Sequence, residues 1–129
     1  NVTRGVWEDM LDQGYGRIVN ISSVNGQRGQ FGQANYSAAK AGMHGVTMTL
    51  AQEGAAKGVT VNTVSPGYVE TAMTLAMRDD VREAIISGIP MRRMGTPAEI
   101  AAAVAFLVAP ENGYVTGINL PVNGGLFIH

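Results

Sequence analysis

The sequence contains no cysteine, which excludes disulfide bonds and thiolate metal sites and is compatible with a reducing cytoplasm. Charge of either sign is scarce and nearly balanced, with 9 Lys and Arg against 10 Asp and Glu and a formal net charge of −1. Such a chain has no strong electrostatic attraction to nucleic acid or to an anionic membrane. No apolar run approaches the roughly 18–20 residues that cross a bilayer, and no signal peptide opens the chain. We expect a soluble cytoplasmic protein with neither nucleic acid nor membrane as a partner.

The length of 129 residues suffices for one domain and is too short for two. Hydrophobic residues make up 46% of the chain and charged residues 15%, a globular composition rather than a disordered one. The chain has no initiator Met, and Asn1 leads directly into a helical pattern that includes Trp7 and Met10. We therefore expect residues 1–129 to be part of a single larger domain.

Helical patterns alternate with short β-branched segments along the chain. The best-marked helix start is Thr96-Pro97-Ala98-Glu99, because Thr96 can cap, Pro97 suits the first helical position and Glu99 completes a capping box. Alternation of strands and helices predicts βαβ units and a parallel sheet, whose ligand crevice lies beyond the carboxyl ends of the strands. The loops that follow Ser22 and Ser65 should face this crevice. The expected helices are 2–13, 35–57, 72–77, 81–88 and 97–109, the expected strands are 17–22, 59–64 and 117–122, and a loop is expected at 24–33.

Tyr36 and Lys40 are four residues apart in the second of these helices, so they should share one face. A free tyrosine has a pKa near 10. An ammonium about 5 Å away favours the phenolate by roughly 3 kcal/mol at an effective dielectric of about 20, which lowers that pKa toward the range useful for acid–base catalysis. Ser23, at the end of the preceding strand, could donate to a carbonyl oxygen while Tyr36 delivers the proton. A Tyr–Lys pair at this spacing also occurs in many helices without catalysis, so the pair alone does not decide.

Three further segments carry a resemblance to the short-chain dehydrogenase/reductase family: Asn20-Ile21-Ser22-Ser23, Asn35-Tyr36-Ser37-Ala38-Ala39-Lys40-Ala41-Gly42 and Val61-Asn62-Thr63-Val64-Ser65-Pro66-Gly67. Their order and spacing both match, and the resemblance continues through residues 117–125. It implies an α/β fold, a Rossmann-like doubly wound parallel sheet. The chain would supply only its carboxyl-terminal half, with about three strands and flanking helices.

The resemblance implies a role for each matched residue. Ser23 polarises the substrate carbonyl, Tyr36 is the acid–base, and Lys40 lowers the tyrosine pKa and hydrogen-bonds the nicotinamide ribose. The turn over the nicotinamide would hold the carboxamide through backbone groups, and the implied cofactor is NADPH, with NADH left open. The cofactor-binding residues implied in this turn are Pro66, Gly67, Tyr68, Val69 and Thr71.

Within the family, the loop at 24–33 and the segment 123–127 are most similar to acetoacetyl-CoA reductases. This similarity implies reduction of acetoacetyl-CoA to 3-hydroxybutyryl-CoA, a homotetramer and a setting in polyhydroxyalkanoate synthesis. Arg78 would meet a CoA phosphate, although it can equally be a solvated charge beside Asp79 and Asp80. The implied substrate-binding residues are Gln30, Phe31, Gly32, Gln33, Tyr68 and Arg78.

Two other functions remain open. A 3-oxoacyl-carrier-protein reductase of the same family would need a basic docking surface, which the near-neutral charge does not favour. A non-catalytic interaction module would have no physical need for the intact trio of Ser23, Tyr36 and Lys40.

Several expected parts of a complete enzyme are missing from the sequence. Gly14-Tyr15-Gly16-Arg17 precedes a strand instead of opening a helix after one, so it is not a dinucleotide-binding turn.

His44 and His129 have no partners at metal-ligand spacing, and we expect no metal site. We expect the isolated 129-residue chain to bind cofactor poorly and to be inactive, with an unpaired sheet edge.

Overall fold

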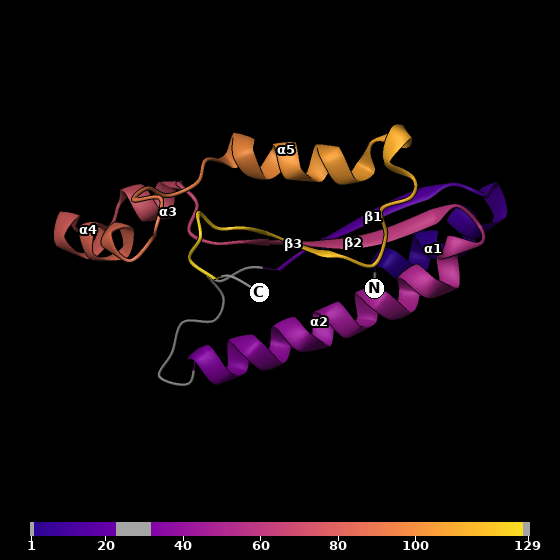
Figure 1. Ribbon diagram of the computed structural model, residues 1–129, viewed down its shortest axis with the longest axis horizontal. Helices are drawn as coiled ribbons and strands as arrows, with labels where there is room; N and C mark the ends of the chain where they lie inside the picture. The colour runs from indigo at the N-terminus through magenta and orange to yellow at the C-terminus, as the bar shows by residue number, and fades with distance from the viewer. Residues whose placement is uncertain (1, 23–31, 128–129) are drawn as a thin grey trace.

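A computed structural model describes residues 2–22 and 32–127, and the side chains of 5–22 and 41–127. Helices and strands alternate in it, as the sequence predicts (Figure 1). The elements in chain order are α1 (Val2–Gln13), β1 (Gly16–Ile21), α2 (Gly32–Ala55), β2 (Val59–Pro66), α3 (Ala72–Leu75), α4 (Asp79–Ser87), α5 (Pro97–Val108), the 3-10 turn η2 (Pro110–Asn112) and β3 (Asn119–Val122).

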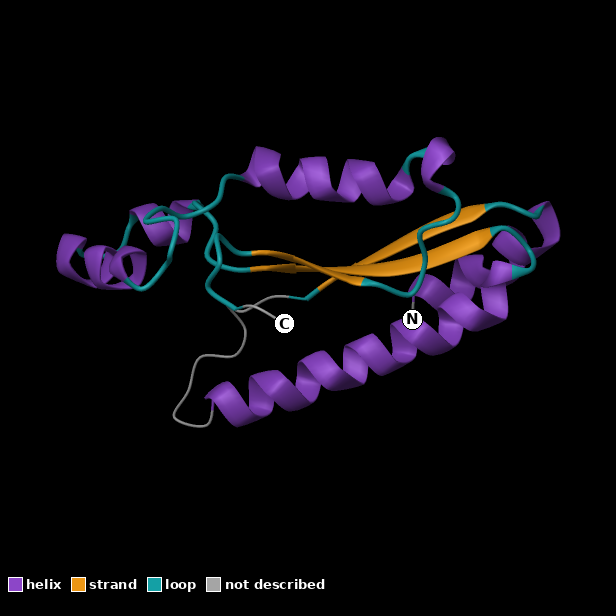
Figure 2. Cartoon of the chain, viewed as in Figure 1, coloured by secondary structure: helices purple, strands orange, loops and turns teal. Residues whose placement is uncertain are grey.

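The three strands form one parallel sheet in the order β1-β2-β3. Helix α5 lies over one face of the sheet, while α1 and α2 lie against the other (Figure 2). The registers run from Gly16↔Val59 to Ile21↔Val64 and from Thr63↔Asn119 to Pro66↔Val122. This arrangement confirms the predicted α/β class. Among the described residues, β1 pairs only with β2 and forms one edge of the sheet.

The core lies on both faces of β2, the central strand, every residue of which is buried. On the α1 and α2 side, Val59 and Val61 pack with Ile18 and Ala51, and Trp7, Met10, Leu11 and Leu50 cover this cluster. Thr47 of α2 is fully buried, and its hydroxyl is hydrogen-bonded to that of Thr63 at 2.7 Å. On the other face, α5 contributes the fully buried Leu107, as its apolar spacing indicates.

Several predicted boundaries were wrong. Helix α2 begins at Gly32 rather than residue 35, so Gly32 and Gln33 belong to the helix and not to the preceding loop. Strand β2 continues through Pro66, which we had placed beyond the strand. Proline has no N–H to donate to a neighbouring strand. It is accommodated here because the Val122 carbonyl of β3 accepts a hydrogen bond from the Gly67 N–H, and because β1, the neighbour on the other side, has already ended.

Gly14 ends α1 with a positive φ of 71°, and its N–H donates to the Met10 carbonyl at 3.1 Å. A Cβ at this position would meet nothing closer than the Lys57 carbonyl oxygen at 4.0 Å, so only the backbone conformation demands glycine. We expect Gly14→Ala to lower the free energy of unfolding by about 1–2 kcal/mol. Gly14→Asn should cost less, because asparagine tolerates this conformation. Urea unfolding measures both, and equal losses would contradict the backbone explanation.

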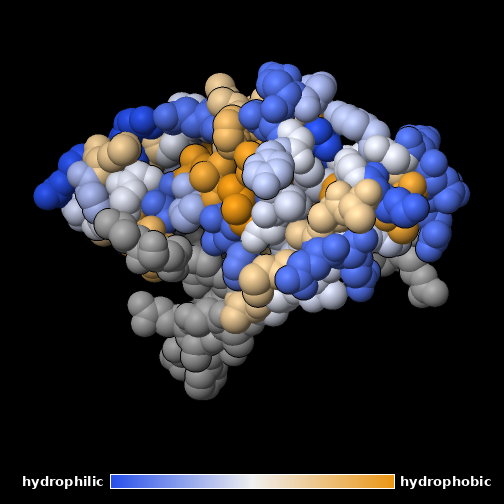
Figure 3. Space-filling view, turned by 45° about the vertical axis from the view of Figure 1, so that its right-hand side comes forward, coloured by the Kyte–Doolittle hydropathy of each residue, from blue (hydrophilic) through white to orange (hydrophobic). Residues whose placement is uncertain are grey.

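Large apolar side chains remain on the surface. Figure 3 shows an apolar patch on one face of the molecule, between more polar regions. In the described ranges, no helix combines the length and hydropathy that crossing a membrane requires. Among the side chains that the structure describes, the most exposed large apolar ones are Tyr114, Met73, Met91, Leu75 and Val46.

Candidate active site

The carboxyl ends of β1 and β2 lie side by side. Strand β1 ends at Ile21, opposite Val64, and the Ser22 N–H donates to the Val64 carbonyl at 2.9 Å. The chain therefore leaves β1 and β2 at the same end of the sheet, as predicted. That both loops face one crevice stays a prediction, since residues 23–31 lie outside the described residues. Ser23, Gln30 and Phe31 fall within residues 23–31, outside the described residues, so their site roles stay predictions.

Helix α2 carries Tyr36 and Lys40 one turn apart. Its first turns lie toward the carboxyl ends of the strands (Figure 1). The helical spacing that underlies the Tyr–Lys hypothesis is therefore present near the carboxyl ends of the strands, where the hypothesis needs it. Gly32 and Gln33 form the start of the same helix. The side chains of residues 32–40 are outside the described part, so the meeting of phenol and ammonium stays a prediction.

The turn after β2 packs closely against the segment after β3. The Gly67 N–H donates to the Val122 carbonyl at 2.9 Å. A Cβ on Gly67 would lie 2.7 Å from the Asn123 Cβ, closer than real side chains come. Two residues earlier, the Ser65 hydroxyl donates to the Asn119 side-chain oxygen at 2.6 Å. The predicted cofactor turn is thus fixed to β3 at its start, and glycine is required there by close approach.

Val69 is opposite Gly95 in an isolated parallel bridge. The Gly95 N–H donates to the Tyr68 carbonyl at 2.9 Å, and the Glu70 N–H donates to the Gly95 carbonyl at 2.8 Å. Because successive peptide groups of an extended chain point in opposite directions, the N–H and C=O of Val69 face away from Gly95. The Val69 carbonyl accepts from the Thr74 hydroxyl at 3.4 Å. Its N–H has no acceptor in the described part of the chain.

Thr71 caps α3 through a reciprocal pair with Thr74. The Thr74 N–H donates to the Thr71 hydroxyl oxygen at 3.2 Å, and the Thr71 N–H donates to the Thr74 hydroxyl oxygen at 2.7 Å. A hydroxyl that accepts one hydrogen bond can still donate its own hydrogen. The exposed Thr71 hydroxyl and the Val69 N–H are therefore two donors on one short turn. They suit a planar amide or a phosphate, which the predicted cofactor would present.

Arg78 stands immediately before α4 and is strongly exposed, as is its neighbour Asp80. Its guanidinium donates from Nε and Nη2 to the two carboxylate oxygens of Asp80 at 3.2 and 3.0 Å. Contact with a CoA phosphate would have to compete with this exposed ion pair. The predicted substrate role of Arg78 therefore remains a prediction.

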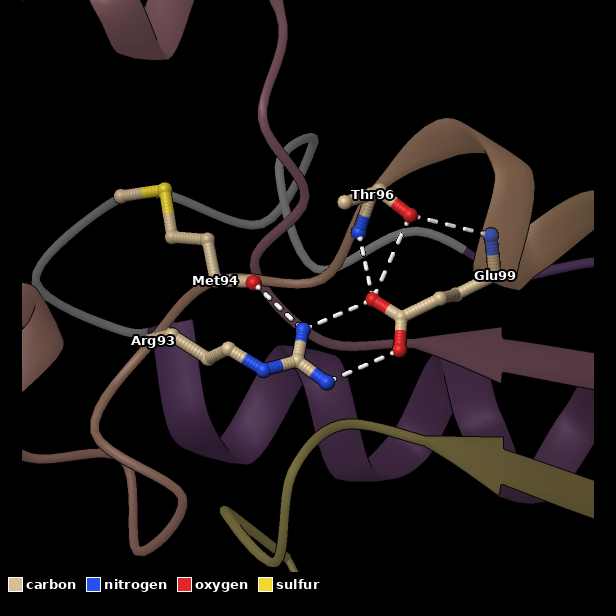
Figure 4. A network of polar contacts seen from close by, with 4 residues as sticks. All are labelled: Arg93, Met94, Thr96 and Glu99. Atoms are coloured by element: carbon tan, nitrogen blue, oxygen red, sulfur yellow. Dashed lines mark hydrogen bonds and ion pairs between the residues drawn. The ribbon is translucent and has the colours of Figure 1, made fainter.

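Arg93 and Glu99 form a network that extends beyond the capping box predicted at Thr96 and Glu99 (Figure 4). The guanidinium donates from Nη1 and Nη2 to the two Glu99 carboxylate oxygens at 2.7 and 2.9 Å. These hydrogen bonds, with the Thr96 N–H as the next contributor, lower the pKa of Glu99 to about 2. Donating to the Glu99 carboxylate in turn raises the pKa of Arg93. The pair therefore stays ionised throughout the neutral range.

A pocket of about 370 Å³ adjoins this network. Its lining comprises Met91, Arg93, Gly95 and Glu99 together with the segment Pro121 to Gly125. The residues of the predicted cofactor turn, 66–71, are not among its walls. Gly95 lines the pocket and also pairs with Val69 of the turn, so the pocket and the turn are neighbours.

Comparison with known proteins identifies the family. A family model described as enoyl-(acyl carrier protein) reductase matches residues 1–127. The chain is 81% identical to the acetoacetyl-CoA reductase of Allochromatium vinosum over 129 residues, which are 100% of this chain and 52% of that protein. Over 126 residues, 98% of this chain and 51% of the relative, it is 61% identical to the acetoacetyl-CoA reductase of Cupriavidus necator. It is 50% identical to the 3-oxoacyl-(acyl-carrier-protein) reductase of Vibrio cholerae over 127 residues, 98% of this chain and 52% of that protein.

The chain therefore belongs to the short-chain dehydrogenase/reductase family, as the sequence motifs predict. It spans about half the length of the curated relatives it matches.

Proposed function

We propose that this chain forms half of an NADPH-dependent reductase that converts acetoacetyl-CoA to 3-hydroxybutyryl-CoA. The observation that carries the proposal is the 81% identity to an acetoacetyl-CoA reductase across the whole chain. Identity to a carrier-protein reductase is lower, at 50%, which favours CoA over a carrier protein as the thioester partner. The proposal includes a cytoplasmic homotetramer that supplies polyhydroxyalkanoate synthesis, for which the family resemblance is the support.

A bound nicotinamide would supply a hydride to the C3 carbonyl carbon of the substrate. In the proposed mechanism Tyr36 donates a proton to the carbonyl oxygen, and Lys40 lowers the pKa of the tyrosine so that this transfer is feasible near neutral pH. Ser23 donates a hydrogen bond that polarises the same oxygen. Two donors that have no acceptor within the described part of the chain fit the carboxamide of the cofactor: the Val69 N–H and the Thr71 hydroxyl.

The substrate would lie beside the loop that precedes α2. In this proposal Gln30 and Gln33 hydrogen-bond the thioester, while Phe31 and Tyr68 pack against the short acyl chain. Gly32 leaves room for the approach of the substrate, and Arg78 meets a CoA phosphate after exchanging its partner Asp80.

The test is a chimera in which this chain replaces the matching 52% of the Allochromatium vinosum enzyme, assayed beside the 129-residue chain alone. We expect the chimera to oxidise NADPH with acetoacetyl-CoA, and the chain alone to be inactive. The value of kcat/KM should be at least about tenfold higher for acetoacetyl-CoA than for the acetoacetyl carrier protein, a difference of roughly 1.4 kcal/mol.

Each other outcome removes part of the proposal. A higher kcat/KM with the acetoacetyl carrier protein would show that the carrier-protein thioester, and not the CoA thioester, is the substrate. A folded chimera that binds neither NADPH nor NADH would favour the interaction module.

A further inference from the structure

Gly95 contacts the predicted cofactor turn from the side opposite to the Val69 N–H. Its N–H and C=O are both engaged, one with the Tyr68 carbonyl and the other with the Glu70 N–H. These two hydrogen bonds hold the peptide groups on either side of Val69. The direction of the Val69 N–H is therefore set by where the Gly95 backbone lies.

Arg93 and Glu99 are hydrogen-bonded to the two residues that flank Gly95 in the sequence. Toward the carboxyl end, Glu99 Oε1 accepts from the Thr96 N–H at 3.0 Å and from the Thr96 hydroxyl at 3.3 Å. Toward the amino end, Arg93 Nη1 donates to the Met94 carbonyl at 3.1 Å, and Met94 itself is buried. The residues that flank Gly95 are thus both tied to one ion pair, as Figure 4 shows.

Helix capping alone does not account for this arrangement. The capping box at the start of α5 needs only Thr96 and one oxygen of Glu99. The other oxygen accepts from Arg93 Nη2, which completes a two-pronged contact. An ion pair with side chains 54% and 43% exposed adds little to stability. A two-pronged arginine contact does, however, fix geometry, because the guanidinium is planar and its donors are rigidly spaced.

We propose that Arg93 and Glu99 are positioning residues that direct the Val69 N–H toward the nicotinamide carboxamide by fixing the backbone of Gly95. This inference rests on the proposed function, since it needs a nicotinamide cofactor on the turn. Neither residue touches the cofactor; both act through Gly95. Both side chains are about half exposed, so substituting them removes no side chain from the core.

The experiment compares two ligands on the chimera. One is NADPH, and the other is 2′-phospho-ADP-ribose, which lacks the nicotinamide ring. Arg93→Gln and Glu99→Gln should each weaken NADPH binding about three- to tenfold, the size of one lost hydrogen bond, and leave 2′-phospho-ADP-ribose binding within about twofold. KM for NADPH should rise with kcat nearly unchanged, because the carboxamide contact is made in both ground and transition states.

Further variants separate positioning from stability. The double variant Arg93→Gln/Glu99→Gln should weaken NADPH binding no more than either single one, since both act through one contact. Arg93→Lys should recover only part of the affinity, because lysine keeps the charge without the fork. Arg17→Gln is the matched control. Arg17 ties the Gly16, Gly58 and Pro110 carbonyls at the opposite, amino-terminal end of the strands, so its loss should change thermal stability and not NADPH binding.

The outcomes distinguish the two proposals. If the unsubstituted chimera binds neither NADPH nor NADH, the proposed function fails and the positioning role fails with it. If it binds NADPH and the Arg93 and Glu99 variants are unchanged, or lose both ligands equally, the positioning role is wrong and the proposed function stands.

Discussion

Tyr36→Phe should lower kcat for acetoacetyl-CoA reduction in the chimera by about 10²–10⁴-fold, the range that a positioned general acid contributes. Phenylalanine keeps the ring and removes only the acidic hydroxyl. Binding of NADPH, measured by fluorescence titration, should change much less than turnover. The loss should therefore fall on kcat rather than on the KM for NADPH.

Tyr114→Phe is the control for this substitution. Tyr114 is fully exposed, at 103% of the reference area, in the loop before β3, so removing its hydroxyl should leave turnover unchanged. A Tyr36→Phe chimera with more than about a tenth of the original kcat would contradict acid–base catalysis by this residue. An equal loss in both variants would indicate damage to the fold instead.

The sequence predicted well those features that depend on neighbouring residues. The bounds of α1 match the prediction of 2–13, and the capping box of Thr96 and Glu99 has both of its hydrogen bonds. These are local signals, since the residues that cap or end a helix lie within a few positions of each other. One non-local feature was also predicted correctly: the carboxyl ends of two strands, near Ser22 and Ser65, lie side by side. Parallel βαβ units place the carboxyl ends of all strands at the same end of the sheet.

Features that depend on tertiary contact were not predictable in the same way. On α2 the apolar Val46 is 57% exposed, whereas the polar Thr47 is fully buried. The reason is the hydrogen bond to Thr63 of β2, which no helical pattern encodes. The bridge between Val69 and Gly95 joins two loops separated by α3 and α4, and only the fold brings them together. The catalytic arrangement of Ser23, Tyr36 and Lys40 remains a prediction from spacing and resemblance.

Asn62 is the buried polar residue whose loss should destabilise the fold most. It lies on the central strand β2 with no exposed area. Its side-chain NH₂ donates to the Val115 carbonyl at 3.0 Å, and its side-chain oxygen accepts from the Ile118 N–H at 3.0 Å. These two bonds hold the loop that leads into β3, and β3 in turn supports the Pro66–Gly67 turn. Asn62 thus connects the core to the candidate site.

Asn62→Leu should lower the free energy of unfolding of the chimera by about 2–4 kcal/mol, because two part-buried backbone groups lose their partners at about 1–2 kcal/mol each. Thr60→Val on the same strand is the matched control. Thr60 is 4% exposed, and its hydroxyl has no hydrogen-bond partner in the described ranges, so its removal should be neutral or should stabilise by up to about 1 kcal/mol. Urea unfolding measures the change for both variants, and the m-values should stay unchanged. Equal losses would show that burial of a polar side chain on β2, and not the clamp on the 115–118 loop, determines the effect.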